Sequence, residues 1–260
     1  QSGGDVGAPT LSAPVDTGPR VSRKNWVAVR QVSRSTPILV MAGHADSQNM
    51  AGSGTSGYTV GVSGGRPMQP GISDELYWNL LTAQTIVRVG QQRGLNIRFY
   101  DPPSRTIYDA RDPRTTWSVG GAFERDQGGY ALEIHYDAYG SAGVGSGLIP
   151  GHGGGIQSLD DALADEFGAF PERFRGLGAP KLGVSLLEIG KLEGNLEQSL
   201  RNPATRDQTL EAIALRVVTA IERGMGVTPG FDSNPAIATD TPSLPSQPSR
   251  RIIRSIFTNQ

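Results

Sequence analysis

The sequence contains no cysteine among its 260 residues. Disulfide bonds, cysteine-ligated zinc, iron–sulfur clusters and thiol nucleophiles are therefore excluded. The absence of cysteine fits an oxidising compartment but does not establish one, because many cytosolic proteins also lack this residue. The chain also has no apolar run that approaches the ~20 residues of a membrane-spanning helix. We therefore expect no membrane span.

The sequence has no excess of charge of either sign. Its 24 Lys and Arg residues nearly balance its 25 Asp and Glu residues, and the formal net charge is −1. A domain that binds nucleic acid or an anionic membrane usually carries a basic patch and a positive net charge. We therefore expect no nucleic-acid partner. The oligomeric state does not follow from the sequence.

Glycine and proline are abundant, at 35 and 18 residues, and they cluster toward the two ends. Residues 1–20 have almost no large apolar side chains, which predicts a flexible N-terminal arm. Residues 227–260 begin with a linker rich in proline and serine and end in a short apolar segment that could dock on the domain. Residues 21–226 are then expected to form one folded domain.

The chain begins at Gln1 and not at methionine. One interpretation is a mature protein whose signal peptide has been removed, and the other is a trimmed chain. On the first interpretation we expect a periplasmic or extracellular protein.

Apolar periodicity predicts strands that alternate with helices. Strands are expected over residues 26–32, 37–41, 95–100, 130–136 and 182–189. Helices are expected over residues 73–92, 117–125, 158–170 and 207–223. Ser73 is a candidate N-cap, Gly94 a candidate C-terminal glycine, and Ser158 with Asp161 a candidate capping box. Glycine-rich loops fill residues 43–72 and 140–155. This alternation predicts a single α/β domain whose mostly parallel or mixed central sheet carries helices on both faces.

Chemically reactive side chains follow the predicted strands. His44 comes after the strand at 37–41, His135 ends the strand at 130–136, and Glu188 ends the strand at 182–189. The first long helix begins with Asp74-Glu75. Ligands of a parallel α/β sheet bind beyond the carboxyl ends of its strands. We therefore expect two imidazoles and two carboxylates at one edge of the sheet.

This combination of side chains suits catalytic zinc. Such an ion takes three protein ligands, His, His and Glu being one known set, and leaves a fourth position for water. It lowers the pKa of the water to about 7 and polarises the carbonyl that is attacked. A further carboxylate, which does not bind the metal, moves the water's proton to the leaving amine. Glu188 is the candidate for that carboxylate, and the sequence predicts a zinc-dependent amide hydrolase.

The motifs follow one another in a recognisable order over about residues 35–224. Gly43-His44 follows a strand, and Glu75 starts a long helix with Asn79 four residues later. A strand then ends in Glu133-Ile134-His135. Glu188 lies in the last strand, with Asn195 downstream. In this order the chain resembles the zinc-dependent N-acetylmuramoyl-L-alanine amidases of the Amidase_3 type, whose corresponding strand end is similar to Ser-Ile-His.

The resemblance implies a role for each of these residues. His44, Glu75 and His135 would be the ligands of Zn²⁺, and Glu188 would be the catalytic carboxylate. The substrate would be peptidoglycan or a muropeptide, cut at the amide between N-acetylmuramic acid and L-alanine. Asn79 and Asn195 would contact the substrate.

The chain departs from the family pattern at three places. Ala45-Asp46-Ser47 follows the first histidine, where the family usually has Gly-Gly and an Asp. The loop over residues 52–71 is long. The usual Arg-x-x-x-Ala-Asn segment is not clearly present, and Arg114 or Arg125 stands in for its arginine. These departures concern the substrate specificity more than the metal site.

Three further residues have two interpretations each. His152, among glycines, either contacts the substrate or is an exposed loop residue. Glu133 points to the same side of its strand as His135, and it either orients that histidine or forms a salt bridge elsewhere. Asp46 either binds a second metal or is a loop or capping residue.

Two other functions also fit the sequence. One is another zinc amide hydrolase, such as a carboxypeptidase. Zinc carboxypeptidases usually present a His-x-x-Glu pair, whereas the third residue after His44 is Ser47. The other is a non-catalytic, amidase-like protein that binds peptidoglycan or a partner.

Overall fold

A computed structural model of the chain describes residues 16–18, 20–21, 24–152, 155–171, 174 and 176–227. The expected arm, 1–20, lies outside these residues apart from 16–18 and 20, and the expected linker and docking segment, 227–260, lie outside apart from residue 227. Thr17 is buried, and its carbonyl oxygen packs against Gly190, where an added Cβ would lie only 2.2 Å away. The division of the chain into arm, domain and linker stays a prediction.

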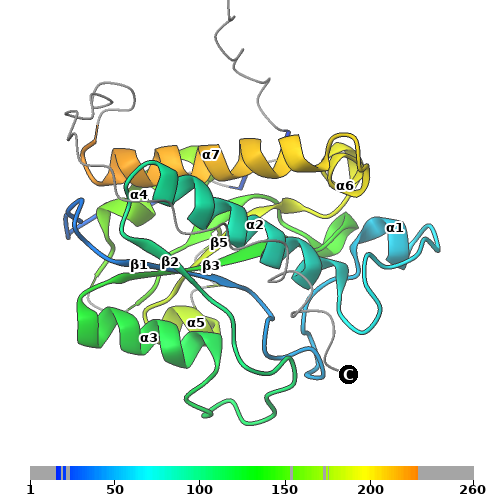
Figure 1. The fold of residues 1–260 in the computed structure, drawn as a ribbon, viewed down its shortest axis with the longest axis horizontal. Helices are drawn as coiled ribbons and strands as arrows, with labels where there is room; N and C mark the ends of the chain where they lie inside the picture. Colours follow the sequence, from blue (N-terminus) through cyan, green and yellow to red (C-terminus); the bar gives the residue numbers. More distant parts are fainter. Residues whose placement is uncertain are drawn as a thin grey trace, which may run out of the picture. The chain divides into compact units, whose positions relative to one another are not determined.

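A five-stranded sheet forms the centre of the described residues (Figure 1). Its strands, in spatial order, are β2 (Ile97–Tyr100), β1 (Ile38–Ala42), β3 (Tyr130–Asp137), β5 (Ser185–Lys191) and β4 (Gly147–Ile149). The first four strands in this order run parallel, and β4 is antiparallel to β5. The expected α/β class with a mostly parallel, mixed sheet is confirmed.

Helices cover both faces of this sheet (Figure 1). One face carries α2 (Asp74–Gln92), α4 (Ser158–Phe167) and α7 (Arg206–Gly224), and α7 packs against both of the others. The other face carries α3 (Thr116–Gln127) and the short α5 (Gly178–Lys181). Strands enclosed on both faces need apolar side chains throughout, and all five residues of β1 are buried. The continuous apolar run at this place in the sequence is thereby explained.

The first long helix, α2, begins and ends where its capping residues predict. The Ser73 hydroxyl accepts a hydrogen bond from the backbone N–H of Leu76 at 3.2 Å. Gly94 follows the helix with a φ of 75°, a left-handed conformation that glycine adopts without strain. The helix therefore starts at a fixed residue, and this start places Glu75 in its first turn.

The prediction of a strand over residues 26–32 is wrong. This segment pairs at one isolated bridge, between Arg30 and Gln157. Its alternating apolar residues do not all face the core, because Val27 and Val29 are 70% and 77% exposed. Alternation makes a strand only where a neighbouring strand supplies hydrogen bonds, and here a single carbonyl, that of Ile156, accepts from both Val29 and Arg30.

Other boundaries also differ from those expected. The glycine-rich loop at 140–155 contains β4, whose three residues are buried. The capping box of α4 is formed by Gln157 and Asp160, one residue earlier than expected, and the helix ends at Phe167. Two helices that the periodicity did not indicate, α1 (Gly57–Gly61) and α6 (Gly194–Arg201), contact one another. Short or glycine-containing elements have too few repeats to show a period.

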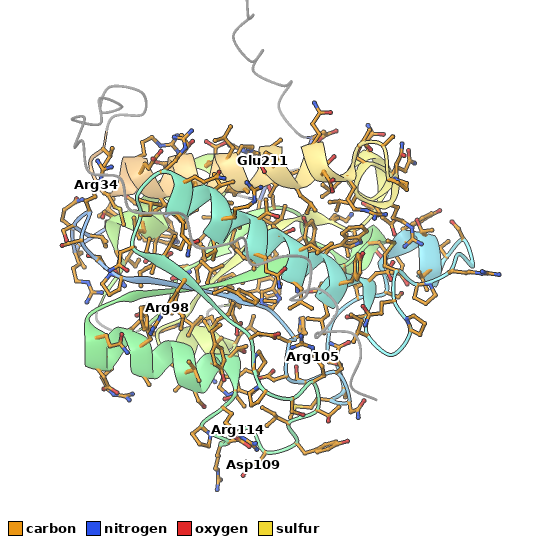
Figure 2. All side chains as sticks on the ribbon, in the orientation of Figure 1. Arg34, Arg98, Arg105, Asp109, Arg114 and Glu211 are labelled. Carbon is orange, nitrogen blue, oxygen red and sulfur yellow. The ribbon has the colours of Figure 1, made fainter. Side chains whose placement is uncertain are left out.

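Charged side chains of both signs spread over the surface (Figure 2). Arg105 and Arg114 both come from the loop between β2 and α3, where each pairs with an aspartate close in sequence, Asp101 and Asp112. These two basic side chains are therefore neutralised locally. Within the described part of the chain, no helix is long and apolar enough to cross a membrane.

Glu124, in α3, is a buried carboxylate between this helix and the sheet. One of its oxygens accepts the backbone N–H of Ala131 at 2.9 Å, and the other has no hydrogen-bond partner within the described residues. Burial raises the pKa of Glu124 to about 8, Asp160 adds to this effect, and the Ala131 N–H and Arg30 oppose it. The carboxyl group therefore keeps its proton in the fold at neutral pH.

Glu124→Gln should change how stability depends on pH. The unfolded chain releases this proton near the ordinary value of 4.5 and the fold releases it near 8, so the free energy of unfolding falls as pH rises between these values. The variant keeps the acceptor for the Ala131 N–H and no longer has a proton to release at this position. We expect its free energy of unfolding, relative to that of the wild type, to increase by on the order of a few kcal/mol as pH rises from 5 to 8. Urea unfolding across this range measures the difference, and parallel curves would contradict it.

Candidate metal centre

The candidate site lies where the order of the strands reverses. The chain passes from β1 outward to β2 and then back across to β3, on the other side of β1. In sheets of this kind the carboxyl ends of the two strands at the reversal leave a crevice that binds ligands. His44 follows the end of β1 by two residues, His135 lies near the end of β3, and Glu188 is its register partner on β5.

The Glu75 carboxylate lies between two imidazoles. Its Oε1 atom is 3.3 Å from His44 Nε2 and 3.3 Å from His135 Nδ1. The two rings stand nearly perpendicular, at 85°, with centroids 4.9 Å apart. Each of the three residues offers one ligand atom, and these atoms all lie within 4.8 Å of one another.

This spacing fits a tetrahedral metal ion. Zinc binds histidine nitrogen and carboxylate oxygen at about 2.0–2.1 Å, so tetrahedral geometry places neighbouring donors about 3.3–3.4 Å apart. The two distances from Glu75 Oε1 both have this value. Glu75 therefore has the right spacing to each imidazole, whereas the two ring nitrogens, which lie within 4.8 Å of each other, would move closer together to hold one ion and would leave a fourth position open.

His44 has a strained backbone. Its φ is 60°, and among the described residues it is the only non-glycine residue with a positive φ. This conformation costs on the order of 1–3 kcal/mol for such a residue and persists where the surroundings enforce it. The Gln48 side chain donates to the His44 carbonyl at 3.0 Å and helps to hold the turn. The strain directs the imidazole toward Glu75.

Gly43 and Asn79 fix the two other ligands from behind. A Cβ on Gly43 would lie 2.1 Å from His135 Cε1, so the ring packs directly on the glycine backbone. The Asn79 amide donates to the Gly43 carbonyl at 3.0 Å and lies 3.5 Å from Glu75 Oε1. Asn79 is fully buried. Its position is therefore behind the ligands, where it supports them, and not on the cavity surface.

The second oxygen of Glu75 is held by the long loop. The backbone N–H of Thr55 donates to Glu75 Oε2 at 2.7 Å. The preceding residue, Gly54, has a φ of 93°, and a Cβ there would lie 3.1 Å from the same oxygen. The loop thus binds Glu75 Oε2, and Oε1 faces the two histidines. The glycine-rich sequence gave no signal that could place Thr55 here.

Burial and charge set the protonation of the centre. Burial raises the pKa of Glu75, but His44 and His135 outweigh it and hold the pKa below its ordinary value. Burial lowers the pKa of His135, but hydrogen bonds to Glu133 and Glu75 and the charge of Glu188 raise it well above the usual range. Burial raises the pKa of Glu188 to about 8, with His135 opposing and Glu75 adding. The centre thus contains more carboxyl groups, those of Glu75, Glu133 and Glu188, than imidazoles, which favours a bound cation.

An open cavity of about 450 Å³ lies over the three candidate ligands. Glu188 lines it, and Glu188 Oε2 is buried with no hydrogen-bond partner within the described residues. Tyr139 forms part of the wall and stacks edge-on against Tyr58, at 6.0 Å between ring centroids. The sequence gave no reason to select this tyrosine pair.

Two expected substrate contacts lie elsewhere. Asn195 is exposed in the first turn of α6, and His152 is exposed in the loop after β4, where its backbone N–H donates to the Pro180 carbonyl. Neither residue lines the cavity. Asp46 is buried, and its carboxylate accepts the N–H of Thr116, the first residue of α3, at 2.8 Å. This contact favours the capping interpretation of Asp46 over a second metal.

No protein-family model matches the chain. No curated protein matches it either. Among solved structures, the chain is similar to the catalytic domain of CwlV, an N-acetylmuramoyl-L-alanine amidase from Bacillus (Paenibacillus) polymyxa var. colistinus. The identity is 14%, the match covers 74% of this chain and 100% of that chain, and the TM-score is 0.47.

Two further solved structures are similar to about the same degree. One is the putative N-acetylmuramoyl-L-alanine amidase from Neisseria meningitidis, with 17% identity, 75% and 99% of the two chains covered and a TM-score of 0.46. The other is the amidase AmiC2 of Nostoc punctiforme, with 12% identity, 75% and 99% covered and a TM-score of 0.44. These similarities are too distant to assign an activity to this chain.

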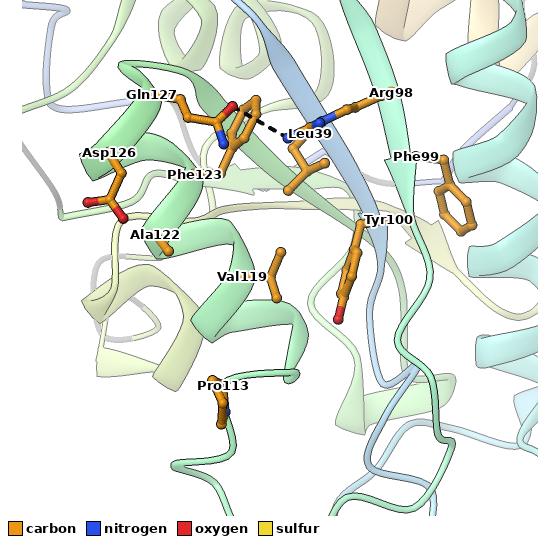
Figure 3. A pocket seen from close by; sticks show the side chains of 10 residues that line it. All are labelled: Leu39, Arg98, Phe99, Tyr100, Pro113, Val119, Ala122, Phe123, Asp126 and Gln127. Carbon is orange, nitrogen blue, oxygen red and sulfur yellow. Dashed lines mark hydrogen bonds between the residues drawn. The ribbon is translucent and has the colours of Figure 1, made fainter.

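A second cavity, of about 390 Å³, lies between the edge strand β2 and α3 (Figure 3). Arg98 and Asp126 are the charged side chains among its lining residues, and the Arg98 guanidinium lies over the Phe123 ring at 4.9 Å. The lining contains no histidine and no pair of carboxylates. The chemistry of a metal centre is therefore confined to the first of the two cavities.

The contact between the loop and Glu75 can be tested at Gly54. Gly54→Ala forces a strained φ and places a methyl group against Ser73 Oγ and Glu75 Oε2, at 2.9 and 3.1 Å. We expect zinc affinity to fall about tenfold or more, as for other losses of a group that orients a ligand. Gly52→Ala is the matched control, because Gly52 has a similar φ of 80° with nothing within 4 Å. Competition with a chromophoric chelator measures both, and equal affinities would show that the contact is unimportant.

Proposed function

We propose that the protein is a zinc-dependent peptidoglycan amidase that hydrolyses the amide between N-acetylmuramic acid and L-alanine. The observation that carries this proposal is the cluster of His44, Glu75 and His135, in which Glu75 Oε1 lies 3.3 Å from each imidazole, with a further carboxyl group, that of Glu188, on the same cavity. Three ligands with an open fourth position are typical of catalytic zinc, whereas structural zinc sites are closed.

Each ligand has a defined part in this proposal. His44 Nε2, Glu75 Oε1 and His135 Nδ1 hold the ion, and Thr55 and Asn79 orient Glu75. A bound zinc ion supplies Lewis acidity, which polarises the scissile carbonyl and lowers the pKa of a water molecule to about 7. The cavity is open on one side, so the end of a peptide or a glycan can reach the ligands.

Glu188 moves the proton. It faces His135 across adjacent strands and stands apart from the three ligands. Its carboxylate accepts a proton from the attacking water while the water oxygen bonds to the carbonyl carbon. The same proton then goes to the leaving nitrogen as the C–N bond breaks. Burial raises the pKa of Glu188 to about 8 in the metal-free centre, and a bound zinc ion would lower this pKa toward neutrality, where the group can both accept and release a proton.

The choice of substrate rests on the order of the motifs. The resemblance of Gly43-His44, Glu75, His135 and Glu188 to the amidase pattern implies the bond to L-alanine. Peptidoglycan lies outside the cytoplasm, so we infer a periplasmic or extracellular location. The positions of Asn195 and His152 give no support to their expected substrate contacts. Tyr139 is the aromatic residue better placed to contact a substrate.

The proposal is tested by measuring zinc and reaction products together. We expect about one zinc per chain in the wild type. Digestion of purified peptidoglycan should release stem peptides with a free L-alanine amine, which mass spectrometry detects. His135→Ala should lose both the zinc and the products, because two remaining ligands rarely hold a catalytic zinc.

The two alternatives give other results in this assay. Free D-alanine or shortened stem peptides would indicate a carboxypeptidase. Zinc-free wild-type protein that binds peptidoglycan and leaves it intact would indicate a binding protein.

Glu188→Gln separates catalysis from metal binding. The variant keeps its size and polarity and loses the proton acceptor. We expect it to fold, to keep its zinc and to hydrolyse substrate at least about a hundredfold more slowly, since general acid–base catalysis contributes 10²–10⁴ in rate. Glu75→Gln is the contrasting variant and should lose affinity for zinc itself. Near-normal turnover by zinc-loaded Glu188→Gln, with only a lower melting temperature, would make Glu188 a structural carboxylate.

A further inference from the structure

Glu133 is a buried carboxylate next to a candidate ligand. It lies two residues before His135 on β3, so both side chains project to the same side of the strand. Glu133 Oε2 is 3.4 Å from His135 Nε2, the ring nitrogen that does not face Glu75. The exposed fractions are 4% for Glu133 and 7% for His135, so bulk water scarcely competes for the contact.

We propose that Glu133 is a positioning residue for the metal centre: its carboxylate accepts the Nε2–H of His135 and thereby fixes the tautomer and ring orientation that present Nδ1 to the metal. This inference rests on the proposed zinc site. It adds to that site a residue that is neither a ligand nor the proton carrier.

The two nitrogens of His135 have different neighbours, and this difference supports the assignment. Nδ1 lies 3.3 Å from Glu75 Oε1, at the donor spacing of a tetrahedral ion, and Nε2 lies 3.4 Å from Glu133. A neutral imidazole carries one N–H, and a metal at Nδ1 requires that proton to be on Nε2. A carboxylate opposite Nε2 stabilises this tautomer. Gly43 packs against the ring and limits its rotation.

The environment of Glu133 argues against a purely structural role. Within the described residues His135 is the only hydrogen-bonding partner given for its side chain, and Glu133 Oε1 is buried without one. A carboxylate so placed is costly unless a positive charge compensates it. His135 supplies this compensation, as a protonated ring in the metal-free centre and as a metal-bound imidazole, whose N–H is a stronger donor than that of a free neutral ring, in the loaded one. Carboxylates hydrogen-bonded to the second nitrogen of a metal-binding histidine occur widely in zinc sites.

Zinc affinity is the first test. Glu133→Gln and Glu133→Ala should bind zinc about 10–100-fold more weakly than the wild type, the usual loss when such a partner is removed. Glu124→Gln is the matched control, since Glu124 is also a buried carboxylate that accepts a hydrogen bond from β3, and within the described residues no hydrogen bond or ion pair joins it to a candidate ligand. Its zinc affinity should stay within about twofold of the wild type. The affinities are measured in full-length protein by competition with a chromophoric chelator.

The tautomer of His135 is a second readout, which a merely structural residue would not change. Long-range ¹H–¹⁵N spectra distinguish the tautomers, and the chain has only three histidines to assign. In the zinc-loaded wild type we expect the proton of His135 on Nε2. In metal-free Glu133→Ala, at a pH where the ring is neutral, the proton should shift toward Nδ1, which faces the Glu75 carboxylate. The wild-type measurement stands even if the variants fold poorly.

The outcomes separate this inference from the proposed function. Wild-type affinity in Glu133→Gln and Glu133→Ala, or a zinc-loaded wild type with its His135 proton on Nδ1, would overturn the positioning role and leave the amidase proposal intact. A wild type that binds no zinc would overturn both. A similar loss of affinity in Glu124→Gln would also overturn the positioning role, because the effect would then follow from any buried carboxylate.

Discussion

The candidate centre depends on one carboxylate, that of Glu75, each of whose oxygens has its own partners. One oxygen lies 3.3 Å from a nitrogen of each imidazole, and the other accepts a hydrogen bond from the backbone N–H of Thr55. Glu75 therefore joins three segments that are far apart in sequence: the turn after β1, the end of β3 and the long loop before α2. The cap at Ser73 fixes where α2 begins, and so it also fixes the height of this carboxylate over the sheet.

The charge of the centre follows from the same arrangement. Glu75, Glu133 and Glu188 surround His135, and burial leaves oxygen atoms of the last two without partners within the described residues. In a medium of low dielectric constant such an excess of acid is unfavourable unless a cation is bound or a proton is retained. The fold thus keeps these groups together at an energetic cost, which a ligand ion can offset. Arrangements of this kind are common at functional sites and rare in ordinary cores.

Much of this arrangement could be predicted from the sequence, and the remainder has physical reasons for being hidden. Strands β1, β3 and β5 are recognisable by their buried apolar residues, and the rule that ligands bind at their carboxyl ends selected His44, His135 and Glu188. The contact of Thr55 with the Glu75 carboxylate is made by the Thr55 backbone N–H, 20 residues away in sequence, so the side chain of residue 55 does not encode it. The positive φ of His44 is equally invisible, because it is enforced by tertiary contacts. Asn79 was predicted from a motif, but its burial shows it supporting the ligands.

The way the loop holds Glu75 also bears on how this site could evolve. The contact uses the Thr55 backbone, while the Thr55 hydroxyl turns to the backbone N–H of Gly57. Conformation at Gly54 is therefore constrained, whereas most side chains of the loop are free to change without disturbing the carboxylate. The same loop lines the cavity. Variation in its sequence can alter which molecules enter while the metal-binding chemistry stays the same, so substrate range and catalytic power can be selected separately.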